Sequence, residues 1–193
     1  MTRHELITKS HATYEDVLAA PPNMVAEIIG GRLSLHPRPA SRHARAASVL
    51  GSKIGGPFDF DEAGPGGWWI VIEPELHLGS DIIVPDLAGW RREKMPVYPD
   101  AAYFDIAPNW VCEVLSPSTR GRDLFEKRPA YAAHGVGHLW LVDPVAMTLE
   151  IFELGPDGYV VAGGGEGDDV IDAVPFEAIP LDLARLWPPT PGT

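Results

Sequence analysis

The chain has little cysteine, no long apolar run and few positive charges, and each shortage excludes a class of protein. Cys112 is the only cysteine in 193 residues, so no disulfide can form within the chain. No apolar run approaches the roughly 18 residues of a membrane-spanning helix. The opening MTRHELITKSHATYED also lacks the apolar centre of a signal peptide. These features predict a cytoplasmic protein that does not bind membranes.

Positive charge is scarce, because 15 Lys and Arg stand against 27 Asp and Glu and give a net charge of −12. Lys and Arg are what hold a nucleic-acid backbone, so this balance argues against a generally basic binding surface. If the cationic groups of the sequence converge in space, a local basic face could still form; otherwise they are separate solvated patches. The groups are Arg38, Arg42, Arg45 and Lys53; Arg91, Arg92 and Lys94; and Arg120, Arg122, Lys127 and Arg128.

Several common catalytic signatures are also missing. The glycine-rich residues 163–167 match neither a dinucleotide-binding fingerprint nor a P-loop, so they are predicted to form a flexible linker. The sequence has no G-x-S-x-G motif, and its seven histidines do not show zinc-ligand spacing. The chemistry must therefore be sought among carboxylates.

The hydrophobic pattern predicts an α/β (α+β) domain with a mixed central β-sheet flanked by helices. The predicted helices cover residues 13–20, 41–55, 120–134 and 181–187. Thr13 and Asp16 resemble a capping pair for the first, Ser41 is expected to cap the second, and His43 falls on the apolar face of that second helix at helical spacing. The predicted strands cover 24–29 and 32–36 around a Gly-Gly turn, then 68–72, 75–78, 82–90, 110–115, 138–142, 148–153 and 159–162. The length suits one domain, expected over residues 1–187, with a loose tail at 188–193.

Two carboxylates stand out because each belongs to an apolar run. Asp86 ends the run that begins at Ile82, and Glu113 lies between Val111 and Leu115 on one face of a predicted strand. A lone carboxylate is costly to bury unless a cation or a donor meets it. Acids at neighbouring strand ends could hold a hard divalent cation that activates a water molecule. Alternatively, Asp86 is a turn residue and Glu113 is a structural carboxylate paired with a cation.

The strings VPDLAGW and WVCEVLSPSTRGRDLFEKRPAYAAHGVGHLWLVDP are similar to those of the Uma-type putative restriction endonuclease family, within the PD-(D/E)XK nuclease superfamily. The resemblance covers roughly residues 12–154, including the EIIGGRL hairpin and the helix that carries His43. It implies a restriction-endonuclease-like core. It also implies an endonuclease that uses Mg²⁺ or Mn²⁺ to hydrolyse phosphodiester bonds, with DNA as the expected substrate.

The resemblance further implies roles for individual residues. Asp86 and Glu113 would hold the metal, assisted by the backbone carbonyl of Val114. The superfamily lysine normally follows the acid by two residues, where this chain has Leu115. Lys127 matches a lysine presented instead from the following helix. Its ammonium would orient the attacking water or stabilise phosphoryl charge.

Three further residues have alternative interpretations. Glu27 matches an acidic position of the family and would be an auxiliary metal ligand or orient Lys127; otherwise it is a solvent-facing strand residue. His43 could contact a phosphate or a metal, or could be a buried, hydrogen-bonded histidine. Pro129 falls inside the predicted helix, where it could turn the segment outward and leave Lys127 exposed and far from Glu113.

Two other functions compete with the endonuclease hypothesis. The net charge and Pro129 favour a catalytically inactive nucleic-acid-binding or protein-interaction module on the same fold. The set of Asp86, Glu113 and Lys127 favours the endonuclease. The third possibility is a structural homodimer whose acids pair with arginines. A homodimer is also expected of the nuclease, through strand and hairpin edges near residues 138–153.

Overall fold

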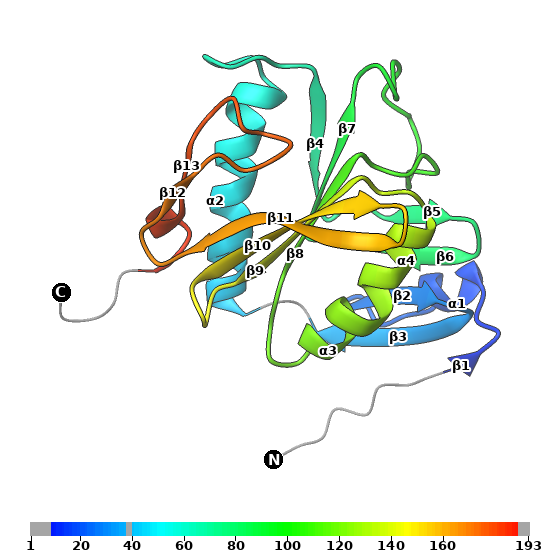
Figure 1. Cartoon of the computed structure of the whole chain (residues 1–193). Coiled ribbons are helices and arrows are strands. Elements are labelled where there is room, and N and C mark those ends of the chain that lie inside the picture. Colours follow the sequence, from blue (N-terminus) through cyan, green and yellow to red (C-terminus); the bar gives the residue numbers. More distant parts are fainter. Residues whose placement is uncertain (1–8, 38–39, 189–193) are drawn as a thin grey trace.

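A computed structural model describes residues 9–37 and 40–188 of the chain. Arg38 and residues 189–193 of the predicted tail lie outside this range. The architecture is α/β, with a six-stranded mixed sheet and a five-stranded antiparallel sheet beside it (Figure 1). The predicted mixed sheet flanked by helices is present, and the second large sheet is an addition that the sequence did not indicate. None of the helices in the described ranges is long and apolar enough to span a membrane.

The five-stranded sheet has the strand order β1-β3-β2-β6-β5. Its centre is the predicted hairpin, in which Gly30 and Gly31 have positive φ angles of 58° and 73°, as a tight two-residue turn requires. The predicted capping pair of Thr13 and Asp16 begins the short helix α1. The elements are β1 (Lys9–Ser10), α1 (Tyr14–Leu18), β2 (Met24–Ile29), β3 (Arg32–Pro37), β5 (Leu76–Leu78) and β6 (Asp81–Ile83).

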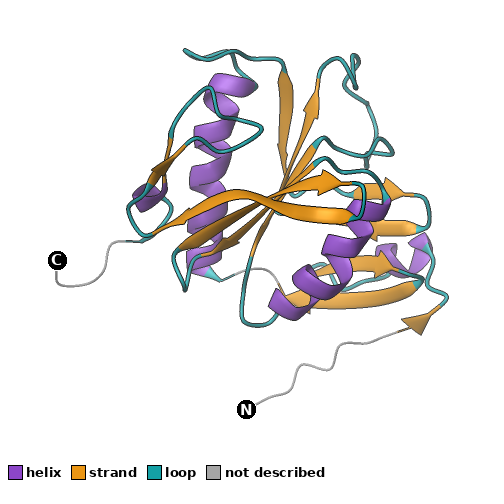
Figure 2. Ribbon diagram, viewed as in Figure 1, coloured by secondary structure: helices purple, strands orange, loops and turns teal. Residues whose placement is uncertain are grey.

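The six-stranded sheet has the order β11-β10-β9-β8-β7-β4, and its strands are β4 (Trp68–Ile72), β7 (Leu87–Arg91), β8 (Trp110–Val114), β9 (His138–Asp143), β10 (Thr148–Gly155) and β11 (Gly158–Glu166). Only β8 and β9 pair in parallel, so a crossover must connect them. The crossover is helical (Figure 2) and consists of α3 (Arg120–Arg122), a π-helical turn η1 (Asp123–Lys127) and α4 (Arg128–Ala133).

Different elements pack on the two faces of the six-stranded sheet. The long helix α2 (Ser41–Phe58) lies on one face and buries Ala46, Leu50, Ile54 and Phe58 against it. The C-terminal elements pack on the same side and are β12 (Val170–Ile171), β13 (Leu181–Asp182) and the 3-10 turn η2 (Leu183–Arg185). The opposite face packs against α4 and against apolar side chains of the five-stranded sheet, including Leu76, Leu78 and Ile83.

The predicted strand over 82–90 is wrong, because the chain leaves one sheet and enters the other within it. β6 ends at Ile83 and β7 begins at Leu87, so residues 84–86 cross between the sheets. Pro85 has no N–H to donate to a strand ladder, which favours a break at this point. The run at 75–78, predicted to continue β4, also belongs to the other sheet as β5. The crossing segment therefore lies between the sheets, with Asp86 at its end.

The predicted linker over residues 163–167 is also wrong. Residues 163–166 belong to β11 and pair with β10. A Cβ on Gly164 would lie 2.5 Å from the carbonyl oxygen of Leu149, and one on Gly165 would lie 3.0 Å from the side chain of Ile171. Glycine is therefore required here by close approach of neighbouring chain segments, not by flexibility.

Three other predictions of elements need correction. α2 begins at Ser41 itself, with Ala40 in the capping position, and continues through Pro57 to Phe58. The predicted C-terminal helix is instead β13 followed by the short turn η2. Residues 138–153 are not a sheet edge, since β9 and β10 each have neighbours on both sides and β11 and β4 are the edge strands. The homodimer itself stays a prediction.

Candidate functional site

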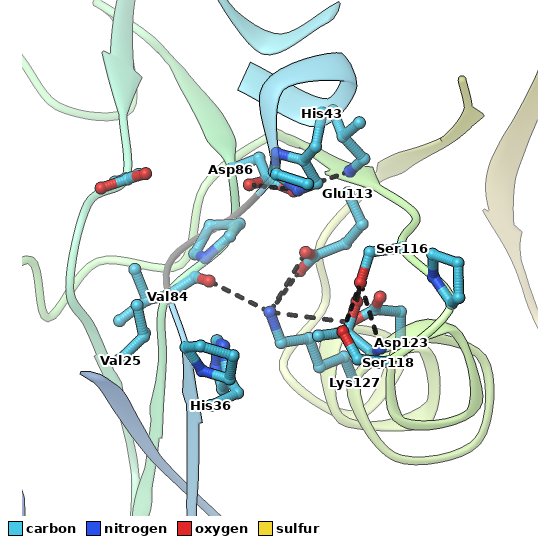
Figure 3. A pocket seen from close by; sticks show the side chains of 17 residues that line it. Val25, His36, His43, Val84, Asp86, Glu113, Ser116, Ser118, Asp123 and Lys127 are labelled. Atoms are coloured by element: carbon cyan, nitrogen blue, oxygen red, sulfur yellow. Dashed lines mark hydrogen bonds and ion pairs between the residues drawn. The ribbon is translucent and has the colours of Figure 1, made fainter. Parts of the chain in front are cut away.

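Most of the residues singled out from the sequence line one pocket, with a volume of about 340 Å³, and Glu27 reaches it only through its contact with Lys127. The pocket lies where the crossing segment, the start of α2, β8 and the crossover helix meet (Figure 3). Its lining includes His43, Asp86, Glu113, Val114 and Lys127. Segments distant in the sequence thus place these five residues in one cavity.

Asp86 is held from two directions. Its Oδ2 accepts a hydrogen bond from the backbone N–H of Val114 at 2.7 Å, and its Oδ1 lies 3.1 Å from Nε2 of His43. His43 is buried on the core-facing side of α2, as its helical spacing predicted. These contacts fix the Asp86 carboxylate against β8, so Asp86 is more than a turn residue.

Glu113 is almost completely buried, with 2% of its surface exposed. Its two carboxylate oxygens lie 3.0 and 3.1 Å from Nζ of Lys127, and the hydroxyl of Tyr131 donates to Oε1. Burial raises the pKa of Glu113 to about 8; Lys127 lowers it, Asp123 and Asp86 raise it, and the Tyr131 hydrogen bond lowers it. The lone carboxylate of β8 therefore meets both a cation and a donor.

Lys127 points into the pocket and is 3% exposed. Its Nζ also donates to the carbonyl oxygen of Val84 at 3.0 Å and lies 3.0 Å from Oε1 of Glu27 and 3.9 Å from Oδ1 of Asp123. The ammonium thus lies between the crossing segment and β8. Figure 3 shows its contacts with Val84 of the crossing segment and with Glu113 of β8.

The outward turn considered for Pro129 does not occur. The π-helical turn η1 ends with the N–H of Arg128 donating to the carbonyl oxygen of Asp123, five residues earlier. Pro129 follows in the first turn of α4, where its missing N–H costs least. Both Asp123 and Lys127 are buried on the pocket side of this widened turn.

Glu27 is fully buried, so the interpretation of it as a solvent-facing strand residue is wrong. Its Oε1 accepts from the N–H of Val84 at 2.8 Å and contacts Lys127. Its Oε2 lies 3.0 Å from Nε2 of His36 and forms an ion pair with Arg122. Glu27 therefore ties the first hairpin to the lysine and to the crossing segment.

Four neighbours of the site were not singled out from the sequence. Asp123 lies four residues before Lys127, a spacing that could have indicated a shared helix face. Arg122 belongs to a cationic group that was read as a possible surface patch, whereas it is turned inward to Glu27. His36 and Tyr131 carry no local signal, because their partners lie in other elements of the fold.

The pocket offers two carboxylates and a backbone carbonyl, which are oxygen donors of the kind that Mg²⁺ accepts. Asp86, Glu113 and the backbone of Val114 offer only oxygen atoms for a metal, and all three residues line the pocket. Within residues 9–37 and 40–188, no group of three or more His, Cys, Asp or Glu side chains is arranged to hold a metal. Mg²⁺ typically takes one or two carboxylates and keeps several waters, which suits such a sparse site.

Comparisons with known proteins agree with this fold. A solved structure, that of a putative nuclease belonging to DUF820 from Anabaena variabilis ATCC 29413, matches with a TM-score of 0.73 and 24% sequence identity. The match covers 91% of this chain and 97% of that one, and it shows a shared fold. No curated protein matches the chain. The model of the Uma2 family, described as putative restriction endonuclease, matches residues 12–184 and thus also includes the C-terminal elements beyond residue 154. The chain therefore belongs to the Uma2 putative restriction endonuclease family.

Proposed function

We propose that the chain is a nuclease that hydrolyses phosphodiester bonds of DNA with the aid of Mg²⁺ or Mn²⁺. The observation that carries this proposal is the position of the Lys127 Nζ, 3.0 and 3.1 Å from the two oxygens of Glu113, in the pocket that Asp86 also lines. Membership of a family of putative restriction endonucleases supports it. The solved structure with the same fold is described as a putative nuclease, which is consistent with the proposal.

The metal would be held by the carboxylates of Asp86 and Glu113, with help from the carbonyl of Val114. When bound, a divalent ion lowers the pKa of a water nucleophile and stabilises charge on the phosphoryl group. His43 contributes indirectly, because its contact at 3.1 Å fixes the rotamer of Asp86.

Lys127 would act on the reacting atoms themselves. Its ammonium is held by the carbonyl of Val84 and by Glu27 and Glu113, so its position is set before substrate binds. An ammonium has three N–H groups, so it would give up one of these contacts to donate a hydrogen bond to the attacking water or to a phosphoryl oxygen, where negative charge develops. Glu27 is a positioning residue in this scheme, since it touches Lys127 and the Val84 N–H.

One observation favours an inactive binding module on the same fold. All four carboxylate oxygens of Asp86 and Glu113 already have partners in the protein, namely His43, Val114, Lys127 and Tyr131. The site is thus satisfied by the chain alone. A metal would have to share or displace these contacts, and direct measurement separates the two functions.

The test is cleavage of plasmid DNA, a labelled DNA duplex and a labelled RNA over a titration of Mg²⁺ or Mn²⁺. Wild type should cleave DNA only with the ion, and Asp86→Asn or Glu113→Gln should lower the rate by about 10²-fold or more. Glu150→Gln removes an exposed carboxylate from β10 and should leave the rate unchanged. Cleavage that persists in chelator or in both site variants would overturn the proposal. Ion binding without cleavage of any substrate would assign the inactive module, and preference for RNA would correct the substrate.

A further inference from the structure

A second cavity lies on the outer side of α2, away from the catalytic pocket. It has a volume of about 550 Å³ and is lined by residues of α2 and of the C-terminal turn η2, the short red turn beside α2 in Figure 1. Three cations line it, Arg45, Lys53 and Arg185, together with the hydroxyls of Ser48 and Ser52. Among the residues that the structure describes, no Asp or Glu lines this groove, although the protein carries a net charge of −12.

Two of the three cations of this groove have no acid partner among the described residues, a property that they share with Arg42, Arg91, Lys94 and Arg128. Within the part of the chain that the structure describes, no carboxylate forms an ion pair with Arg45 or Lys53. Arg185 pairs with Asp182 at 3.0 Å, but the pair is exposed and therefore worth little. Other cations are engaged by acids: Arg32 by Glu126, Arg92 by Asp59 and Asp61, Arg120 by Asp143, Arg122 by Glu27, and Lys127 by Glu27, Glu113 and Asp123.

The groove and the catalytic pocket are both lined by residues of helix α2. Arg45 and Lys53 project from the solvent side of α2, whereas His43 faces the core. They are eight residues apart, so they are separated by about 12 Å along the helix axis at about 1.5 Å per residue. This corresponds to three or four nucleotides of a strand that rises by about 3.4 Å per nucleotide. Ala40 and His43, at the start of the same helix, line the catalytic pocket.

We propose that the groove between α2 and η2 binds the phosphodiester backbone of a nucleic-acid strand whose continuation enters the Asp86–Glu113 pocket. The proposal rests on the nuclease function for the identity of the ligand. Hydroxyls and cations recognise phosphate oxygens without reading bases. Trp187 also lines the groove, but it is buried and its Nε1–H donates to the carbonyl of Gly167, so it offers no free face on which a base could stack. Binding here is therefore independent of sequence.

An acidic protein repels a polyanion over most of its surface, so a groove that gathers three cations and two hydroxyls, with Arg45 donating to the carbonyl of Arg185, should contribute most to affinity. The test measures binding of labelled duplex DNA, single-stranded DNA and RNA by fluorescence anisotropy, in chelator to prevent metal-dependent cleavage. Arg45→Gln with Lys53→Gln should weaken binding about tenfold or more. It should also reduce the slope of log K against log salt by about 1.8 for duplex DNA, or about 0.9 for each lost phosphate contact.

The matched control is Arg32→Gln with Lys94→Gln, which removes the same charge from exposed cations outside the groove. An equal loss of affinity in both double variants would mean general charge attraction and would overturn the proposal, as would unchanged binding in the groove variant. Wild type that binds none of the three probes would overturn it too.

Cleavage is measured separately, so binding through the groove without cleavage would uphold the groove and reject the nuclease function. Cleavage of DNA by the wild type, together with unchanged DNA binding by the groove variant, would reject the groove and uphold the nuclease function. Circular dichroism of each variant shows that the fold is retained.

Discussion

The two faces of the six-stranded sheet stabilise the molecule in different ways, and one strand shows the difference. Along β8, Trp110, Cys112 and Val114 face α2 and pack in a wholly apolar cluster. Val111 and Glu113 point to the other face, where apolar side chains surround buried charges. Apolar burial is not directional, so the α2 face needs only side chains of suitable size. The opposite face needs every charged partner in place, because an unpaired buried charge is costly.

The largest expected effect comes from breaking the apolar face at Trp140. Its ring is fully buried, lies 5.1 Å from Trp110 and 5.6 Å from Phe176 between ring centres, and its Nε1–H donates to the carbonyl of Val174. Trp140→Ala should lower the free energy of unfolding by about 3–5 kcal/mol. Denaturant unfolding measures this loss, and Trp140→Phe should recover part of it. Cleavage per folded molecule should not change; a loss below about 1 kcal/mol would show that this face is loosely packed.

The next effect is expected on the charged face from Lys127→Ala, which lowers activity and also lowers stability, because it leaves Glu27 and Glu113 buried without their cation. We expect the cleavage rate to fall about 10²-fold while metal affinity changes little, because a charged lysine is not a metal ligand. Lys127→Arg should not restore full activity, since a planar guanidinium cannot replace a compact ammonium. Rates and calorimetric metal titration measure the two quantities, with Lys94→Ala as a surface control. Parallel loss of metal affinity and rate would mean that Lys127 maintains the metal site instead.

The smallest effect is a pH dependence that originates at His36. Burial, with a contribution from the nearby Lys127, lowers the pKa of His36 from 6.5 to about 4. The unfolded chain therefore takes up a proton near pH 6.5 that the folded protein accepts only near pH 4, so His36 makes stability fall as the pH drops through this window. His36→Gln should reduce the fall in melting temperature between pH 6.5 and 4 by a few degrees. If the melting temperature of His36→Gln falls with pH as steeply as that of the wild type, the carboxylates alone cause the loss of stability in acid.

Much of the fold follows from local sequence signals. The Gly30-Gly31 turn, the Thr13–Asp16 cap and the strand at Trp68–Ile72 were correct because adjacent residues determine them. The run over 82–90 was misread because it is continuously strand-like, and only pairing with strands of two different sheets divides it. Local pattern therefore gives the elements, while the allocation of strands to sheets depends on distant partners.

The site shows the same limit. The family resemblance singled out Asp86, Glu113, Lys127 and Glu27, and the structure brings all four side chains to one region. Their chemical roles stay predictions. The inward direction of Lys127 depends on the π-helical turn, and local sequence gave no sign that this turn would form. The burial of Glu27 likewise depends on Arg122, which lies far along the chain.

The ion pairs at Lys127 also constrain the order in which the molecule can assemble. The acids that touch it or share its pocket, at positions 27, 73, 86, 113 and 123, all come before it in the chain. A ribosome releases them in that order, so a nascent chain contains these acids before it contains their ammonium. β9, the parallel neighbour of β8, emerges later still. Chains truncated before residue 127 should therefore leave Glu27 and Glu113 without this partner, which makes the pocket a late product of synthesis.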